Sequence, residues 1–77
     1  PSALIADEVP FLSAELDERL AVLWRELEIV ATPRNVVDTL AALFAARPDL
    51  GVLDVGLPGL VGLELARLVP VVLVVLV

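Results

Sequence analysis

Hydrophobic residues along the 77-residue chain alternate between short uninterrupted runs and longer stretches with helical spacing. A short apolar run between turn residues is typical of a buried strand, whereas apolar positions that recur every three or four residues are typical of a helix. The short runs predict strands at residues 3–6, 27–31, 50–55 and 70–77. The stretches between these strands predict three helices.

Local signals place the starts and ends of these helices. Pro10 suits the first turn of the first helix, where its missing N–H costs nothing, and Pro48 stops the second helix. Residues 32–35 form the loop before the second helix, and residues 59–62 open the third. The apolar positions are Leu12, Leu16, Leu20, Leu23 and Leu27 for the first helix, Val36, Val37, Leu40, Leu43 and Phe44 for the second, and Leu65 and Leu68 for the third.

The alternation of strands and helices predicts the fold class. Strands with near-continuous apolar runs, joined by helices, indicate an open parallel α/β sheet with right-handed crossovers. A chain of 77 residues makes one small domain, which we assign to residues 1–77. The valine-rich end of the chain is ordinary for a buried parallel strand.

Composition and charge exclude several classes of protein. The net charge is −6, and the five cations are scattered arginines, so the sequence has no basic patch for nucleic acid. The run "VVLVVLV" is far shorter than the roughly 20 residues that a membrane-spanning helix needs. The chain has neither a signal-peptide pattern nor an initiator methionine, so we expect a processed or incomplete form of a longer protein.

Three carboxylates mark the candidate chemistry. Asp7 and Glu8 follow the first predicted strand, and Asp54 lies at the end of the third. If these strands are neighbours, the three acids converge on the carboxyl edge of the sheet, where open α/β sheets bind their ligands. The chain has no histidine and no cysteine, and hard oxygen ligands favour Mg²⁺ over zinc. The alternative is that Asp7 or Glu8 caps the helix that begins near Pro10.

Three blocks of the sequence match the pattern of a known family: "ALIADEVPFLSAEL", "LEIVATPRNVVDTLAALFAARPDLGVLDVGLPGLVGLELARL" and "PVVLVVLV". Together they resemble the receiver domain of bacterial two-component response regulators. Within that family the sequence is most similar to the subgroup with a LytTR-type DNA-binding output module. The most specific part is "RPDLGVLDVGLPGLVGLEL", which matches the family pattern in order and spacing. The resemblance implies a flavodoxin-like topology with strand order 2-1-3-4, without the fifth strand and the last two helices.

The resemblance also implies roles for individual residues. Asp54 matches the aspartate that accepts a phosphoryl group from a histidine kinase. Asp7 and Glu8 match the acidic pair that binds Mg²⁺, and the backbone carbonyl of Gly56 matches a further protein ligand. The expected activity is Mg²⁺-dependent self-phosphorylation at Asp54 in the cytoplasm, which controls a transcriptional output module. No turnover of a small molecule is expected.

The chain departs from the family pattern in its switch residues. Val75 stands where the family has Ser or Thr, and the family's lysine has no counterpart. Val36 replaces a common glycine, and Val61 replaces a polar helix cap. These departures keep open a non-phosphorylated interaction module or a structural fragment. An exposed fourth strand without charges further predicts a homo-oligomer joined through residues 71–77.

Overall fold

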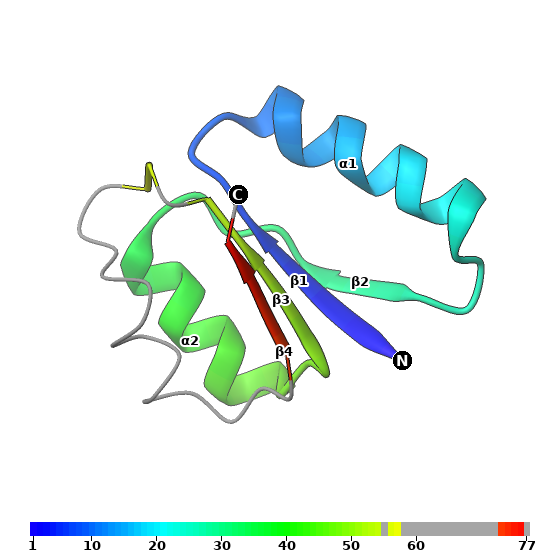
Figure 1. Ribbon diagram of the computed structural model, residues 1–77. Helices are drawn as coiled ribbons and strands as arrows, with labels where there is room; N and C mark the ends of the chain where they lie inside the picture. The colour runs from blue at the N-terminus through cyan, green and yellow to red at the C-terminus, as the bar shows by residue number, and fades with distance from the viewer. Residues whose placement is uncertain (55, 58–72, 77) are drawn as a thin grey trace.

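Four parallel strands form one open sheet, and a helix lies on each side of it (Figure 1). The computed structural model describes residues 1–54, 56–57 and 73–76. The strands are ordered β2-β1-β3-β4, and each neighbouring pair runs parallel. The predicted α/β class and the strand order 2-1-3-4 are therefore confirmed.

The elements follow one another as the hydrophobic pattern predicts. The described strands and helices are β1 (Ser2–Ala6), α1 (Pro10–Leu23), β2 (Glu28–Ala31), α2 (Val36–Ala46), β3 (Leu50–Leu53) and β4 (Leu73–Leu76). Strand β3 is shorter than the predicted range of 50–55, so Asp54 comes directly after its end. The predicted third helix, with Val61, Leu65 and Leu68, lies outside the described residues.

Helix α2 has well-defined signals at both ends. The Asn35 side chain accepts a hydrogen bond of 2.8 Å from the N–H of Asp38, which satisfies one of the free donors of the first turn. Asp38 adds a negative charge where the helix dipole is positive. At the other end, Arg47 takes a left-handed conformation with φ of 46°, and its N–H bonds to the carbonyl of Leu43. Pro48 then prevents further helix.

The core lies between the sheet and α2. Its buried residues are Leu4, Ala6, Leu43, Leu53 and Leu57. Strand β1 is also buried at Ala3 and Ile5, so its side chains are covered on both faces. Such a strand has no polar face, which explains why the sequence of β1 shows no alternation. The first acidic residue of the chain appears only after β1 has ended.

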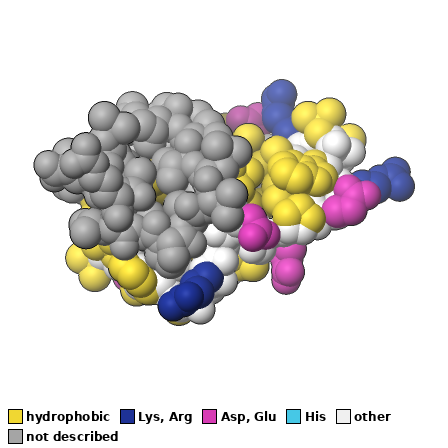
Figure 2. Space-filling view, turned by 60° about the horizontal axis from the view of Figure 1, so that its bottom comes forward, with side chains coloured by type: hydrophobic (Ala, Val, Ile, Leu, Met, Phe, Trp, Pro, Cys, Tyr) yellow, Lys and Arg dark blue, Asp and Glu magenta, His cyan; other side chains and the backbone are white. Residues whose placement is uncertain are grey.

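Helix α1 packs less closely than its leucine spacing suggests. Leu16 and Leu20 are half-buried, whereas Leu12 and Leu23 are exposed, with Leu23 at 82%. The one residue of α1 that is fully covered is Ser13. Exposed hydrophobic side chains also appear on the face seen in Figure 2, next to acidic and arginine side chains. Within the described residues, no helix has the length and apolar character needed to cross a membrane.

Candidate functional site at the carboxyl edge of the sheet

Backbone hydrogen bonds hold three loops together at the carboxyl edge of the sheet. The N–H of Asp54 donates to the carbonyl oxygen of Ala6 at 2.9 Å, and the N–H of Asp7 donates to that of Pro33 at 3.2 Å. The register agrees, because Ala6 of β1 pairs with Leu53 of β3. Asp7 and Asp54 therefore leave neighbouring strands side by side, as the parallel arrangement requires.

The carboxylates of Asp7 and Asp54 are fixed in the same way. Oδ1 of Asp7 accepts a hydrogen bond of 2.9 Å from the N–H of Val9, and Oδ1 of Asp54 accepts one of 2.9 Å from the N–H of Gly56. Each aspartate thus bonds to the backbone two residues further along, which is the geometry of an Asx turn. Both residues are half-buried, and Oδ2 of each has no hydrogen bond within the described part of the chain.

The capping alternative for the first acids is not what the structure shows. Val9 is the N-cap residue of α1, and no side chain caps this helix. Asp7 bonds instead to the N–H of Val9 itself, and Glu8 is exposed. The start of α1 therefore relies on Pro10, as the sequence predicts.

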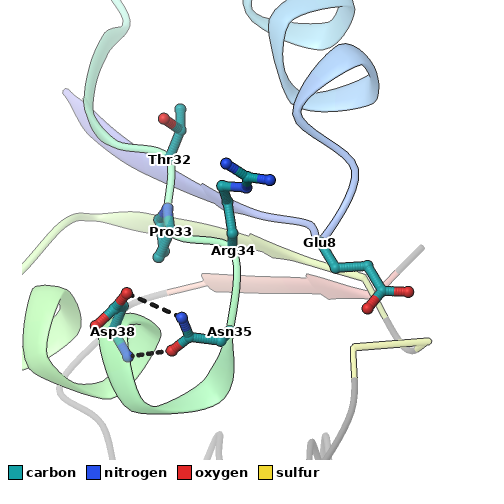
Figure 3. Close-up of a pocket in the computed structure, with 6 residues that line it drawn as sticks. All are labelled: Glu8, Thr32, Pro33, Arg34, Asn35 and Asp38. Carbon is teal, nitrogen blue, oxygen red and sulfur yellow. Dashed lines mark hydrogen bonds between the residues drawn. The ribbon is translucent and has the colours of Figure 1, made fainter.

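Glu8 lies on the wall of a hollow of about 570 Å³ that Asp7 and Asp54 do not line. In Figure 3 its side chain points away from Arg34 and Asn35. The other residues that line the hollow belong to the β2–α2 connection and the first turn of α2: Thr32, Pro33, Arg34, Asn35 and Asp38. Sequence reasoning missed this hollow, although the Asn35–Asp38 capping pair was a signal for a fixed loop.

Gly56 stands close to the carboxylate of Asp54. A Cβ atom at this position would lie 3.3 Å from Oδ1 and 3.6 Å from Oδ2 of Asp54. Gly56 does not need glycine for a left-handed backbone, because its φ is not in that region. The absence of a side chain therefore leaves space directly beside the candidate acceptor.

The donor set has the chemistry of a hard-cation site, but its three acids are not gathered. Asp7, Glu8 and Asp54 supply carboxylate oxygens, and Gly56 supplies a backbone carbonyl, which are ligand types that Mg²⁺ prefers. Across the described residues, no group of three acids, histidines or cysteines is close enough to hold a metal ion. Glu8 is exposed, and its side chain would have to join Asp7 and Asp54 to complete the set.

Asp49 shows the contrasting behaviour of an acid at the amino edge of the sheet. Its Oδ2 accepts a hydrogen bond of 2.9 Å from the N–H of Ser2, and its own N–H donates to the carbonyl of Ser2 at 2.9 Å. This pair ties β1 to the residue before β3. Asp49 therefore stabilises the pairing at the amino edge of the sheet and does not belong to the candidate site.

Comparison with known proteins relates the chain to a bacterial regulatory protein. The chain is 41% identical over 66 residues to an uncharacterized response regulatory protein of Vibrio cholerae, a match that covers 86% of this chain. The chain spans about a quarter (25%) of the length of that relative. No protein-family model matches the sequence. The chain is thus a distant homologue of a response regulatory protein, and its parallel sheet is consistent with a fragment of a receiver domain.

Proposed function

We propose that residues 1–77 act as a receiver-like domain in which Asp54 accepts a phosphoryl group from a histidine kinase. The observation that carries this proposal is the hydrogen bond from the Asp54 N–H to the Ala6 carbonyl, which places Asp54 beside Asp7 at one edge of the sheet. The similarity to a response regulatory protein supports the same assignment. Asp54 is also half-buried at the end of a strand, where a nucleophile is both fixed and accessible.

The proposed step is a single phosphoryl transfer. Because the Gly56 N–H engages Oδ1 of Asp54, Oδ2 is the oxygen that attacks phosphorus. The P–N bond of the phosphohistidine breaks, a P–O bond to Oδ2 forms, and the leaving imidazole takes up a proton from solvent. The product is an aspartyl phosphate on this chain. This is self-phosphorylation, without turnover of a small substrate.

Asp7, Glu8, Asp54 and the carbonyl oxygen of Gly56 are the residues that would hold Mg²⁺ in this proposal. A bound divalent cation supplies charge screening, without which a carboxylate and an anionic phosphoryl group repel each other. To bind Mg²⁺ with this ligand set, the Glu8 side chain must move toward Asp7 and Asp54. We expect this movement to be a side-chain rotation, because Glu8 is exposed and Asp7 already holds the loop through Val9.

Partners follow from the proposed reaction. A histidine kinase donates the phosphoryl group in the cytoplasm, and the phosphorylated domain controls a transcriptional output module of the LytTR type that the sequence resembles. The domain itself carries no basic patch for nucleic acid. Strand β4 is the outer strand of the described sheet, and we propose that residues 71–77 join copies of the chain through this edge. Sedimentation of Val74→Lys tests the contact, and an unchanged oligomer would exclude it.

One structural feature favours a non-phosphorylated interaction module instead. Oδ1 of Asp7 and Oδ1 of Asp54 are both engaged by local N–H groups, and Glu8 lies on another hollow. In such an arrangement, backbone N–H groups orient the two carboxylates. The two functions differ in whether phosphate becomes attached to the chain.

Labelling with a small phosphodonor separates the two functions. The wild-type chain, incubated with acetyl phosphate and Mg²⁺, should acquire acid-labile phosphate, and omission of Mg²⁺ should prevent this. Asp54→Asn keeps the size of the side chain but removes the nucleophile, so it should remain unlabelled. Asp49→Asn is the matched control and should label as the wild type does. Equal labelling of wild type and Asp54→Asn would exclude Asp54 as the acceptor.

A further inference from the structure

A second, smaller hollow lies between α1 and the segment that follows β2. Its volume is about 190 Å³, well above the roughly 30 Å³ that one water molecule occupies in the liquid. Helix α1 contributes Pro10, Ser13, Ala14 and Asp17, and the segment after β2 contributes Thr32 and Arg34. This hollow is separate from the aspartates of the candidate phosphorylation site.

Ser13 gives the first indication that the hollow binds a ligand. The residue is 4% exposed, and its Oγ is fully buried without a hydrogen-bond partner in the described structure. A buried hydroxyl that lacks a partner is costly, and native proteins usually satisfy such groups. Ser13 also lines the adjacent hollow, so a change of its side-chain rotamer would bring the hydroxyl to a partner there.

The charged groups around the hollow give the second indication. Arg34 and Asp17 approach it from different elements, yet they do not form an ion pair. In the described part of the chain, the ion pair present joins Arg19 to Glu15 on α1. Arg34 and the hydroxyls of Ser13 and Thr32 can donate hydrogen bonds, and the Asp17 carboxylate can accept them.

The balance of these groups selects the ligand class. Arg34 and Asp17 together carry no net charge, and the chain as a whole carries −6, which disfavours a free anion. A molecule with one carboxylate and one ammonium group can pair with both Arg34 and Asp17. From this complementarity we infer that the hollow binds a small zwitterion of the amino-acid class. Its carboxylate faces Arg34, Ser13 and Thr32, and its ammonium group faces Asp17.

Nuclear magnetic resonance of the 77-residue chain tests this site with glycine as the probe. Amide signals of Ser13, Asp17, Thr32 and Arg34 should shift and saturate at millimolar glycine. Acetate and methylammonium, which each carry one of the two charges, should bind at least fivefold more weakly at equal ionic strength. Absence of saturable shifts with glycine would overturn the inference. Equal binding of acetate would replace the zwitterion with a simple anion and would overturn it as well.

Variants of the lining residues identify the groups that bind glycine. Arg34→Gln and Asp17→Asn should each weaken glycine binding at least fivefold, and Ser13→Ala should weaken it about threefold or more. Arg47→Gln, at the end of α2, is the matched arginine control and should leave binding unchanged. If Ser13→Ala does not fold, Thr32→Val removes the other hydroxyl and should weaken binding instead. Stronger binding by Asp17→Asn, or unchanged binding by Arg34→Gln, would contradict the proposed orientation.

Discussion

The backbone N–H of Asp54 lies 2.9 Å from the carbonyl oxygen of Ala6 and donates a hydrogen bond to it. This bond continues the pairing of β1 with β3 by one step beyond the end of β3. The candidate phosphoacceptor is therefore fixed by the sheet at its backbone, whereas its carboxylate is fixed by Gly56. Asp7 follows Ala6 directly, so the same backbone hydrogen bond also fixes the position of Asp7 at the edge of the sheet.

The metal proposal predicts weak Mg²⁺ binding that depends on Glu8. We expect a dissociation constant in the millimolar range, which corresponds to about 4 kcal/mol. Glu8→Ala should weaken binding several-fold, because it removes one oxygen ligand and one charge. Amide shifts near Asp54 during a Mg²⁺ titration provide the measurement. Glu18→Ala on the outside of α1 serves as the control, and an equal loss in both variants would argue for non-specific charge screening.

The capping arrangement at α2 predicts a loss of stability for Asn35→Ala. The variant removes the acceptor for the Asp38 N–H and should lower the free energy of unfolding by about 1 kcal/mol. Urea denaturation followed by circular dichroism measures this change. Asn35→Ser retains a neutral side-chain oxygen that can accept this hydrogen bond and should keep most of the stability. A stability loss in Asn35→Ser as large as that in Asn35→Ala would show that the cap does not depend on the side-chain oxygen.

The two described glycines predict opposite responses to alanine. A Cβ at Gly51 in β3 would meet Leu43 and Leu53 at 4.0 Å, which is ordinary contact distance. Gly51→Ala should raise the free energy of unfolding by about 0.5–1 kcal/mol, because glycine loses more backbone freedom on folding. Thermal and urea unfolding check this value, and a marked destabilisation would mean that β3 is packed more tightly against α2 than it is here.

Gly56→Ala should instead alter the Asp54 side chain. The added Cβ would lie 3.3 Å from Oδ1, so the carboxylate must move by a few tenths of an ångström. We expect the carboxyl carbon signal of Asp54 to shift in Gly56→Ala and to stay unchanged in Gly51→Ala. Identical spectra for Asp54 in the wild type and in Gly56→Ala would show that this contact is absent in solution.

Val75 predicts slow phosphorylation that a hydroxyl would improve. Its Cα pairs with that of Val52 across β3 and β4, at a position where the resembled family carries Ser or Thr. Val75→Thr offers a hydrogen bond to the charged phosphoryl group, which is worth about 1.5–3 kcal/mol. Labelling from acetyl phosphate should therefore become at least several-fold faster, whereas Val74→Thr should have no such effect. Equal rates for Val75→Thr and the wild type would argue against this role.

The hydrophobic pattern was sufficient to predict the sheet, because burial of strands on both faces leaves a clear trace in sequence. The run of Ala3 to Ala6, which carries no polar residue, predicts β1 as a buried strand, and Pro10 marks the start of α1, whereas the strand order followed only from the family resemblance. The positions of Asp7 and Asp54 then follow from the parallel direction of the strands. These predictions depend on the backbone, whose geometry the pattern largely determines.

Side-chain directions were harder to predict. Glu8 follows Asp7 in sequence, but it lies on the wall of the β2–α2 hollow, because adjacency in a loop does not fix the direction of an exposed side chain. The leucines of α1 have regular helical spacing, yet Leu12 and Leu23 are exposed and Ser13 is buried. Spacing identifies a helix, but how the helix sits on the sheet depends on contacts that no single segment specifies.

Chemical mapping of the phosphate tests the central claim most directly. An aspartyl phosphate is reduced by borohydride to homoserine, which mass spectrometry of the digested protein can locate. After incubation of the wild-type chain with acetyl phosphate and Mg²⁺, homoserine should be found at position 54. Homoserine at position 7 or 49, or no homoserine in a chain that remains folded, would contradict the assignment of Asp54 as the phosphoacceptor.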